Sequence, residues 1–194
     1  MNSVETDTSS PQLIPVGAFD IVVFGAAGDL ALRKLIPALF HRWRDGQIPE
    51  SSRIVGTART QMSDDEYRQL ALESFREFHP ADKIDDSEWA SFSQHIYYAG
   101  LDATSPDSEW GPLRERLEDD QHKQRVFYLA LPPGIYGAVC QNIERAGLKS
   151  DNARIVLEKP IGKNLKTAHE VNEAVGAVFD EQSIFRIDHY LGKE

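Results

Sequence analysis

Cysteine is almost absent from this sequence, which holds one, Cys140, among 194 residues. One cysteine cannot form an internal disulfide, and no group of cysteines and histidines has the spacing of a zinc site. These absences exclude a disulfide-stabilised fold and a zinc-binding module, and we expect no metal centre. A single thiol is typical of a protein kept in a reducing compartment, so the cytoplasm is the expected location.

Long apolar runs and an excess of basic residues are also missing. No stretch approaches the roughly 18 apolar residues that a membrane-spanning helix needs. The first residues, MNSVETDTSSPQL, lack the basic start and the apolar run of a secretory or transit peptide. Lys and Arg number 21 against 31 Asp and Glu, a formal net charge of −10, whereas proteins that bind nucleic-acid backbones usually carry a basic face. We therefore expect neither a membrane nor a nucleic acid as a partner.

The composition that remains is that of a globular protein, with 41% hydrophobic and 27% charged residues. The length fits one domain of ordinary size. Residues 1–17 are rich in Ser, Thr, Asp and Pro and lack periodic apolar positions, so we expect them to be a mobile tail. Residues 18–194 are expected to form the folded domain.

Apolar runs alternate with amphipathic stretches after the tail. Six runs predict strands: FDIVVF, RIVGTA, HIYYAG, RVFYLA, ARIVLE and SIFRI. Helices are predicted between them, at 29–44, 63–78, 106–120, 134–146 and 164–179. FDIVVF and RVFYLA are almost continuously apolar, which is typical of parallel strands covered on both faces. The alternation predicts an α/β fold, Rossmann-like and doubly wound, with a mostly parallel six-stranded sheet.

A glycine-bearing turn joins the first predicted strand to the first helix. Gly25 permits a tight turn, Gly28 lets the backbone approach a phosphate, and the helix N-terminus presents free amide donors. Ala31 stands where a third glycine is often found, and its small side chain still allows the helix to pack closely on the strand. The turn predicts a pyrophosphate site; the alternative is a turn that binds nothing.

The end of the second predicted strand indicates which nucleotide would bind. A carboxylate there would favour the free ribose hydroxyls of NAD, whereas a 2′-phosphate needs a cation. The sequence has Arg59 at this place, and an arginine can form bidentate hydrogen bonds with a phosphate and can stack on adenine. NADP is therefore the expected cofactor, and a solvated surface arginine is the alternative.

Two further phrases follow later strands. Glu158-Lys159-Pro160 ends the fifth, and Asp188, His189, Tyr190 and Lys193 follow the sixth. Ligands of open α/β sheets bind beyond the carboxyl ends of the strands, so these side chains share one edge with the glycine turn. A phosphorylated polar substrate would be bound well by this set of groups, which comprises an acid, an imidazole, a phenol and ammonium groups. The alternative is that they are solvent-exposed surface residues with no role in binding.

Five phrases together resemble the glucose-6-phosphate dehydrogenase family: GAAGDLALRKL at 25–35, VGTAR at 55–59, FYLALPP at 127–133, EKP at 158–160 and FRIDHYLGKE at 185–194. They occur in the family's order and cover nearly the whole chain after the tail. One departure is Ala27, where the family often has Ser or Thr, so a hydroxyl contact to phosphate is lost. The family's chains continue well beyond the last phrase into a C-terminal α+β substrate domain. The resemblance thus implies an N-terminal dinucleotide-binding domain without that substrate domain.

The resemblance implies oxidation of glucose 6-phosphate at C1 to 6-phosphogluconolactone, with hydride passing to NADP, in the oxidative pentose phosphate pathway. Arg59 would hold the 2′-phosphate, and Leu131 and Pro132 would lie against the nicotinamide half. The resemblance also implies which turn residues would hold the pyrophosphate: Gly25, Ala26, Ala27, Gly28, Asp29 and Leu30.

The resemblance also assigns the substrate side. Lys159 would bridge cofactor and sugar, His189, Tyr190 and Lys193 would bind the sugar phosphate, and Asp188 would orient the catalytic histidine. That histidine lies after the RIDHYLGKE phrase in the family, so this chain alone is expected to bind cofactor without oxidising the sugar. The full-length protein is expected to be a homo-oligomer.

Two other functions stay open at this point: another sugar or amino-acid oxidoreductase with the same domain arrangement, and a non-catalytic NADP-binding module. The remaining histidines have no acid and nucleophile at useful spacing, so structural or surface roles are expected for His41, His79, His95, His122 and His169. Cys140 is expected to be a small buried residue of a helix.

Overall fold

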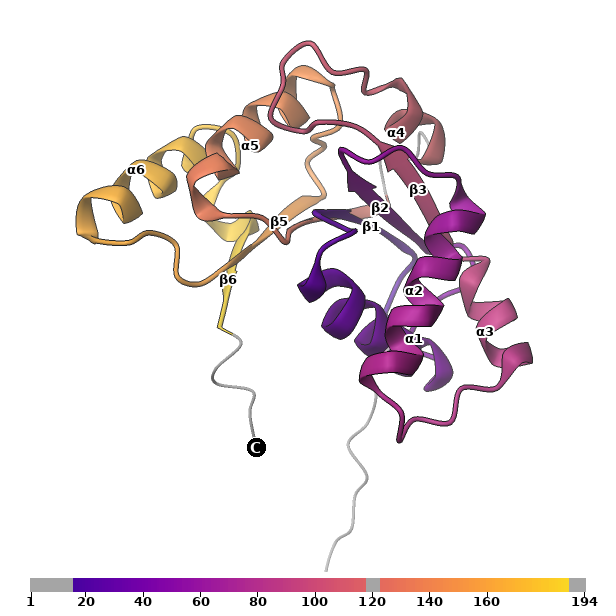
Figure 1. Cartoon of the computed structure of the whole chain (residues 1–194). Helices are drawn as coiled ribbons and strands as arrows, with labels where there is room; N and C mark the ends of the chain where they lie inside the picture. Colours follow the sequence, from indigo (N-terminus) through magenta and orange to yellow (C-terminus); the bar gives the residue numbers. More distant parts are fainter. Residues whose placement is uncertain (1–15, 118–122, 189–194) are drawn as a thin grey trace, which may run out of the picture.

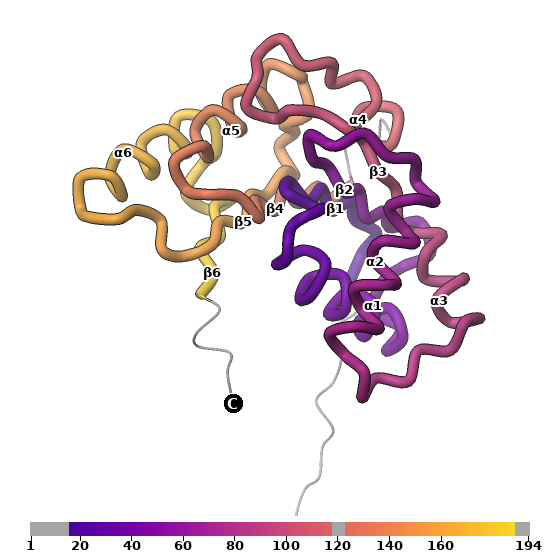
Figure 2. The backbone as a smooth tube through the Cα atoms, viewed as in Figure 1, coloured from indigo at the N-terminus to yellow at the C-terminus, as the bar shows by residue number. Residues whose placement is uncertain are grey.

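One sheet of six parallel strands organises the chain. The computed structural model describes residues 16–117 and 123–188. The sheet lies at the centre of the molecule (Figure 1). Its strand order is β3-β2-β1-β4-β5-β6, so β1 lies between β2 and β4 (Figure 2). The strands are β1 (Phe19–Phe24), β2 (Arg53–Ala58), β3 (Ile96–Gly100), β4 (Gln124–Leu129), β5 (Ala153–Glu158) and β6 (Ile184–Ile187). The doubly wound α/β fold is confirmed, and every pairing is parallel.

Helices cover both faces of this sheet. The π-helical turn η1 (Ala31–Leu35), α1 (Ile36–Arg44), α2 (Asp64–Phe78) and α3 (Asp86–Ser93) pack on one face. On the other lie α4 (Gly111–Arg116), α5 (Tyr136–Arg145) and α6 (Leu165–Gly176). Short 3₁₀ turns, η2 (Pro133–Ile135) and η3 (Glu181–Ser183), precede α5 and β6. Figure 2 shows α1, α2 and α3 grouped on the side away from α5 and α6.

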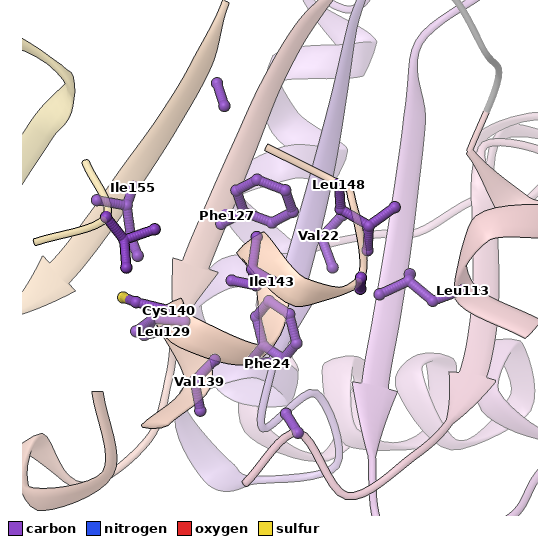
Figure 3. Packing of buried hydrophobic residues seen from close by; sticks show 14 of the residues in the cluster. Val22, Phe24, Leu113, Phe127, Leu129, Val139, Cys140, Ile143, Leu148 and Ile155 are labelled. Carbon is purple, nitrogen blue, oxygen red and sulfur yellow. The ribbon is translucent and has the colours of Figure 1, made fainter. Parts of the chain in front are cut away.

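Each face of the sheet has its own hydrophobic cluster, because successive side chains of a strand point to opposite faces. Val22 and Phe24 of β1 belong to one cluster, and Val23 belongs to the other. In the first, Cys140 and Ile143 of α5 pack on the strands (Figure 3). Cys140 is fully buried, as expected, and burial raises the pKa of its thiol to about 12.

Local signals in the sequence set two helix ends. Ser63 caps α2: its hydroxyl accepts the Glu66 N–H at 3.2 Å, and the Glu66 carboxylate accepts the Ser63 N–H at 2.7 Å. This reciprocal arrangement satisfies two amides that the first helical turn leaves free. Helix α5 ends at Arg145, and Gly147, two residues later, has a φ of +67°, in the left-handed region that glycine adopts without strain.

Three helix predictions need correction. Of the helix predicted at 106–120, α4 begins only at Gly111, because the preceding segment forms turns in which Ser105 N–H donates to Asp102 O and Ser108 N–H donates to Ser105 O; residues 118–120 lie outside the described ranges. The helix predicted at 164–179 ends at Gly176, where Val178 N–H bonds back to Val175 O. Helix α3 was not predicted, since its eight residues show little periodicity. Most of the tail predicted at 1–17 lies outside the described residues.

A buried ion cluster joins the N-terminal ends of β1 and β4. The Asp20 side chain has no exposure, and its Oδ1 lies 2.7 Å from Lys123 Nζ and its Oδ2 3.8 Å from Arg125 Nη2. Lys123 also donates to the carbonyl of Ser51 at 2.6 Å, which ties in the start of β2. Charges this deeply buried need partners, because each has lost its hydration.

Replacing the carboxylate tests this cluster. Asp20→Ala should lower the free energy of unfolding by about 3–5 kcal/mol, because two cations would stay buried without it. Urea denaturation followed by circular dichroism measures the change. Glu50→Ala, at an exposed acidic position, is the control and should change the free energy by less than about 0.5 kcal/mol. Equal effects of the two substitutions would contradict a stabilising role for the cluster.

Candidate functional site

A pocket of about 420 Å³ opens at the carboxyl ends of β1, β2 and β4 and beside the segment that follows β3. We call it the strand-end pocket. It brings together five of the residues predicted from the sequence: Gly25, Gly28, Arg59, Leu131 and Pro132. The other lining residues are Phe24, Thr57, Ala58, Leu101, Asp102, Ala103, Thr104, Ala130 and Ile135. The pocket lies beside the point where the strand order reverses between β1 and β4, where ligands of such sheets bind.

The turn after β1 is fixed against both neighbouring strands. The N–H groups of Gly25 and Ala26 donate to Thr57 O of β2 at 2.9 and 3.1 Å. On the other side, Gly25 lies against the Ala130 carbonyl that follows β4, so a Cβ on Gly25 would overlap that oxygen. Its φ of +85° also requires glycine. The tight turn predicted at Gly25 is confirmed.

The amides of this turn divide into two groups. Those of Gly25, Ala26 and Gly28 donate to backbone carbonyls, the last to Gly25 O at 2.9 Å. In the described part of the chain, the amides of Ala27, Asp29 and Leu30 donate to no carbonyl of another segment. They stand at the beginning of a helix, where free N–H groups and the helix dipole favour an anion.

The side chains of the turn are arranged to leave this end open. Ala26 is fully buried, and its carbonyl accepts the Tyr67 hydroxyl at 3.1 Å. Gly28 is exposed, and a Cβ there would approach only Gly25 O, at 3.1 Å. Asp29 is largely exposed and lies 3.3 Å from Arg33. The turn therefore lines the pocket with the backbone of its glycines, whereas its one carboxylate, that of Asp29, lies beside Arg33.

The end of β2 supplies an exposed cation and a buried hydroxyl. Arg59 is exposed and lines the pocket. Thr57 is 1% exposed, and among the described residues its hydroxyl oxygen has no hydrogen-bond partner. A buried hydroxyl without a partner is costly, and one at the lining of a pocket is available to a bound group.

Sequence reasoning missed the segment after β3. Asp102 and Thr104, in that segment, line the pocket, and Thr57 was also overlooked. Asp102 and Thr104 belong to no recognised motif, and Thr57 lies within the VGTAR phrase at 55–59 without a predicted role. The signal that could have found them is their position, because parallel strands end at the same edge and β3 was correctly predicted.

The Glu158-Lys159-Pro160 segment is held separately, at the ends of β5 and β6. The Tyr128 hydroxyl donates to Glu158 Oε1 at 2.6 Å, and burial raises the pKa of Tyr128 strongly, so this proton stays on the phenol. Lys159 N–H donates to Ile187 O at 2.9 Å, and the Lys159–Pro160 bond is cis. The Lys159 side chain is exposed and does not line the strand-end pocket. Its backbone is therefore anchored at the same edge.

The remaining predicted substrate residues fall at the limit of the described chain. Asp188 follows β6 directly and is half-buried. His189, Tyr190 and Lys193 lie outside the described residues. Their predicted roles stay predictions.

The other conspicuous side chains have structural surroundings. His41 and His79 both face Asp82, at 3.3 and 3.6 Å, and His95 contacts the carbonyl of Ser52. Over residues 16–117 and 123–188, no group of His, Cys, Asp and Glu could hold a metal ion. None of the helices in the described ranges is long and apolar enough to cross a membrane.

Comparisons with known proteins agree with this geometry. The family model for glucose-6-phosphate dehydrogenase, NAD binding domain, matches residues 22–194. Glucose-6-phosphate 1-dehydrogenase of Rhizobium meliloti (strain 1021) is 46% identical over 185 residues, covering 95% of this chain and 38% of the relative. The same enzyme of Gluconobacter oxydans (strain 621H) is 43% identical, covering 92% and 37%.

Solved structures give the same match. The crystal structure of glucose-6-phosphate 1-dehydrogenase from Mycobacterium avium has a TM-score of 0.80 at 28% identity, over 90% of this chain and 36% of that one. A glucose-6-phosphate dehydrogenase in complex with its substrate glucose-6-phosphate has a TM-score of 0.77 at 33% identity, over 91% and 37%. The chain therefore spans little more than a third of the proteins it matches.

Removing one hydroxyl tests how the Glu158 segment is held. Tyr128→Phe should lower the free energy of unfolding by about 1–2 kcal/mol, because a half-buried carboxylate loses a charge-assisted hydrogen bond. Thermal or urea unfolding measures the change. Tyr97→Phe, which keeps the ring that Arg53 contacts, is the matched control. A Tyr128→Phe variant as stable as the control would show that the bond contributes nothing.

Proposed function

Because the chain belongs to the glucose-6-phosphate dehydrogenase family, within its NAD binding domain, we propose that it is the cofactor-binding part of an enzyme that oxidises glucose 6-phosphate to 6-phosphogluconolactone with NADP. The observation that carries the proposal is the strand-end pocket, in which the turn at Gly25 and the cation Arg59 line one cavity. A nicotinamide dinucleotide needs both a phosphate cradle and a site for its adenosine end.

The residues present fit such a cofactor. A Cβ at Gly25 would fill the contact between the turn and Ala130, so the turn closes only with glycine there. The unpaired hydroxyl of Thr57 offers one polar contact to a bound group. NADP is favoured over NAD because β2 is followed by Arg59, whose guanidinium matches the geometry of a phosphate.

Each residue has a defined task in this proposal. The amides of Ala27, Asp29 and Leu30, which donate to no carbonyl of another segment among the described residues, would hold the pyrophosphate. Arg59, which lines the pocket, would hold the 2′-phosphate. Leu131 and Pro132 give the nicotinamide half an apolar wall that keeps water away. When bound, the nicotinamide supplies the hydride acceptor.

The substrate side follows the family resemblance. The Lys159 ammonium bridges cofactor and sugar, and His189, Tyr190 and Lys193 donate hydrogen bonds to the sugar phosphate. Asp188 accepts a hydrogen bond from the histidine that takes the C1 hydroxyl proton, which the resemblance places after the RIDHYLGKE phrase. The C-terminal domain of the family is thus the partner of this one, in a cytoplasmic homo-oligomer.

Cofactor choice is tested at Arg59. Arg59→Ala should reduce the preference for NADP over NAD roughly ten- to a hundredfold, the worth of a charge-assisted bidentate contact. Fluorescence or calorimetric titration of both nucleotides measures it. Arg145 is the last residue of α5, is exposed and does not line the pocket, so Arg145→Ala should leave the ratio unchanged. An unchanged ratio in Arg59→Ala would refute the assignment.

The phosphate cradle is tested at Gly28. Gly28→Val places a branched side chain where the pyrophosphate approaches the backbone, and should weaken NADP and NAD alike by roughly tenfold. Gly111→Val is the control, since a Cβ there meets nothing within 4 Å and the position lies outside the pocket. Loss of NADP binding alone would show that Gly28 does not face the pyrophosphate.

A further inference from the structure

The strand-end pocket carries a negative charge beside its positive one. Arg59 follows β2 and Asp102 follows β3, and both line the cavity. The two strands pair in parallel with Ala58 opposite Gly100, and the Leu101 N–H donates to Ala58 O at 2.9 Å. The backbones that carry Arg59 and Asp102 therefore leave the sheet side by side.

The Asp102 carboxylate is held in place by its own loop. Its Oδ1 accepts the Thr104 N–H at 3.0 Å and the Thr104 hydroxyl at 2.6 Å, and the Ser105 N–H donates to its carbonyl at 3.1 Å. The Thr104 hydrogen bonds, and after them the charge of Arg59, lower the pKa of Asp102. The group is thus a fixed anion within electrostatic reach of Arg59.

A fixed anion at this place acts differently on the two nucleotides. A 2′-phosphate drawn to Arg59 brings up to two negative charges toward Asp102 and is repelled by it. A free 2′-hydroxyl is neutral and can donate a hydrogen bond to a carboxylate. Asp102 also neutralises part of the field of Arg59 in the absence of any ligand.

We propose that Asp102 is a specificity-determining residue that opposes Arg59 and limits the preference of this site for NADP over NAD. The proposal rests on the proposed function, because it takes the strand-end pocket to hold the adenosine end of a nicotinamide dinucleotide. It assigns the strength of the preference to two residues that follow adjacent strands. Arg59 alone, without Asp102, would give a stronger preference for NADP.

The alternative is that Asp102 only closes its turn. Asp102→Asn separates the two roles, because the asparagine oxygen can still accept both bonds from Thr104 while the charge is removed. Asp102→Ser, whose hydroxyl can also close such a turn, is a second variant of different size. Asp107→Asn is the matched control: it removes the same charge from the same loop at an exposed position outside the pocket.

The experiment is calorimetric titration of NADP and of NAD into the wild-type chain and the three variants at low salt. Asp102→Asn and Asp102→Ser should tighten NADP binding roughly three- to tenfold and leave NAD binding equal or weaker. Asp107→Asn should change neither. The gain for NADP should shrink at about 1 M salt, where the screening length falls to about 3 Å.

The outcomes separate this inference from the proposed function. If the wild-type chain binds both nucleotides but the Asp102 variants keep its NADP-to-NAD ratio, the inference is wrong and the proposed function stands. A shift of the same size in Asp107→Asn would also overturn it, since the effect would then be one of overall charge. If the wild-type chain binds neither nucleotide, both fall together.

Discussion

The close contact of the β1 turn with both neighbouring strands is the constraint on which the rest of the site depends. Gly25 donates to Thr57 O on one side and lies against Ala130 O on the other. Only a residue without a side chain fits between them at a φ of +85°. Because the turn is fixed in this way, Gly25 and Gly28 line the cavity that the ends of β2 and β4 border.

The parallel arrangement separates stability from binding along the strands. At the amino ends, Asp20, Lys123 and Arg125 form a buried ion cluster that no ligand needs to reach. At the carboxyl ends, Arg59 is exposed, Asp102 is half-buried and both line an open pocket. A chain with a net charge of −10 can therefore still present a local cation to an anionic cofactor. The position of a charged residue in the sheet therefore determines its role more than the net charge of the chain does.

The sequence predicted those features that depend on local patterns. All six strands were found, since buried parallel strands are short and apolar, and the start of α2 was found from its capping residues Ser63 and Glu66. Helix α3 was missed because a helix of two turns has little periodicity to detect. The segment before α4 was mistaken for helix because its turns, closed by Ser105 and Ser108, depend on backbone bonds that have no periodic signature.

The candidate site was predictable to a similar extent. Gly25, Gly28 and Arg59 belong to strand ends with recognisable patterns, and they do meet in one pocket. Asp102 lies in no recognised motif and Thr57 had no predicted role within the VGTAR phrase, so their place in the pocket follows only from strand order and register. Burial raises the pKa of the Cys140 thiol to about 12, and this has a practical consequence for experiments on the pocket. A second cysteine introduced on the rim would react with a fluorescent maleimide at neutral pH far faster than Cys140, so the native sequence is already suited to site-specific labelling.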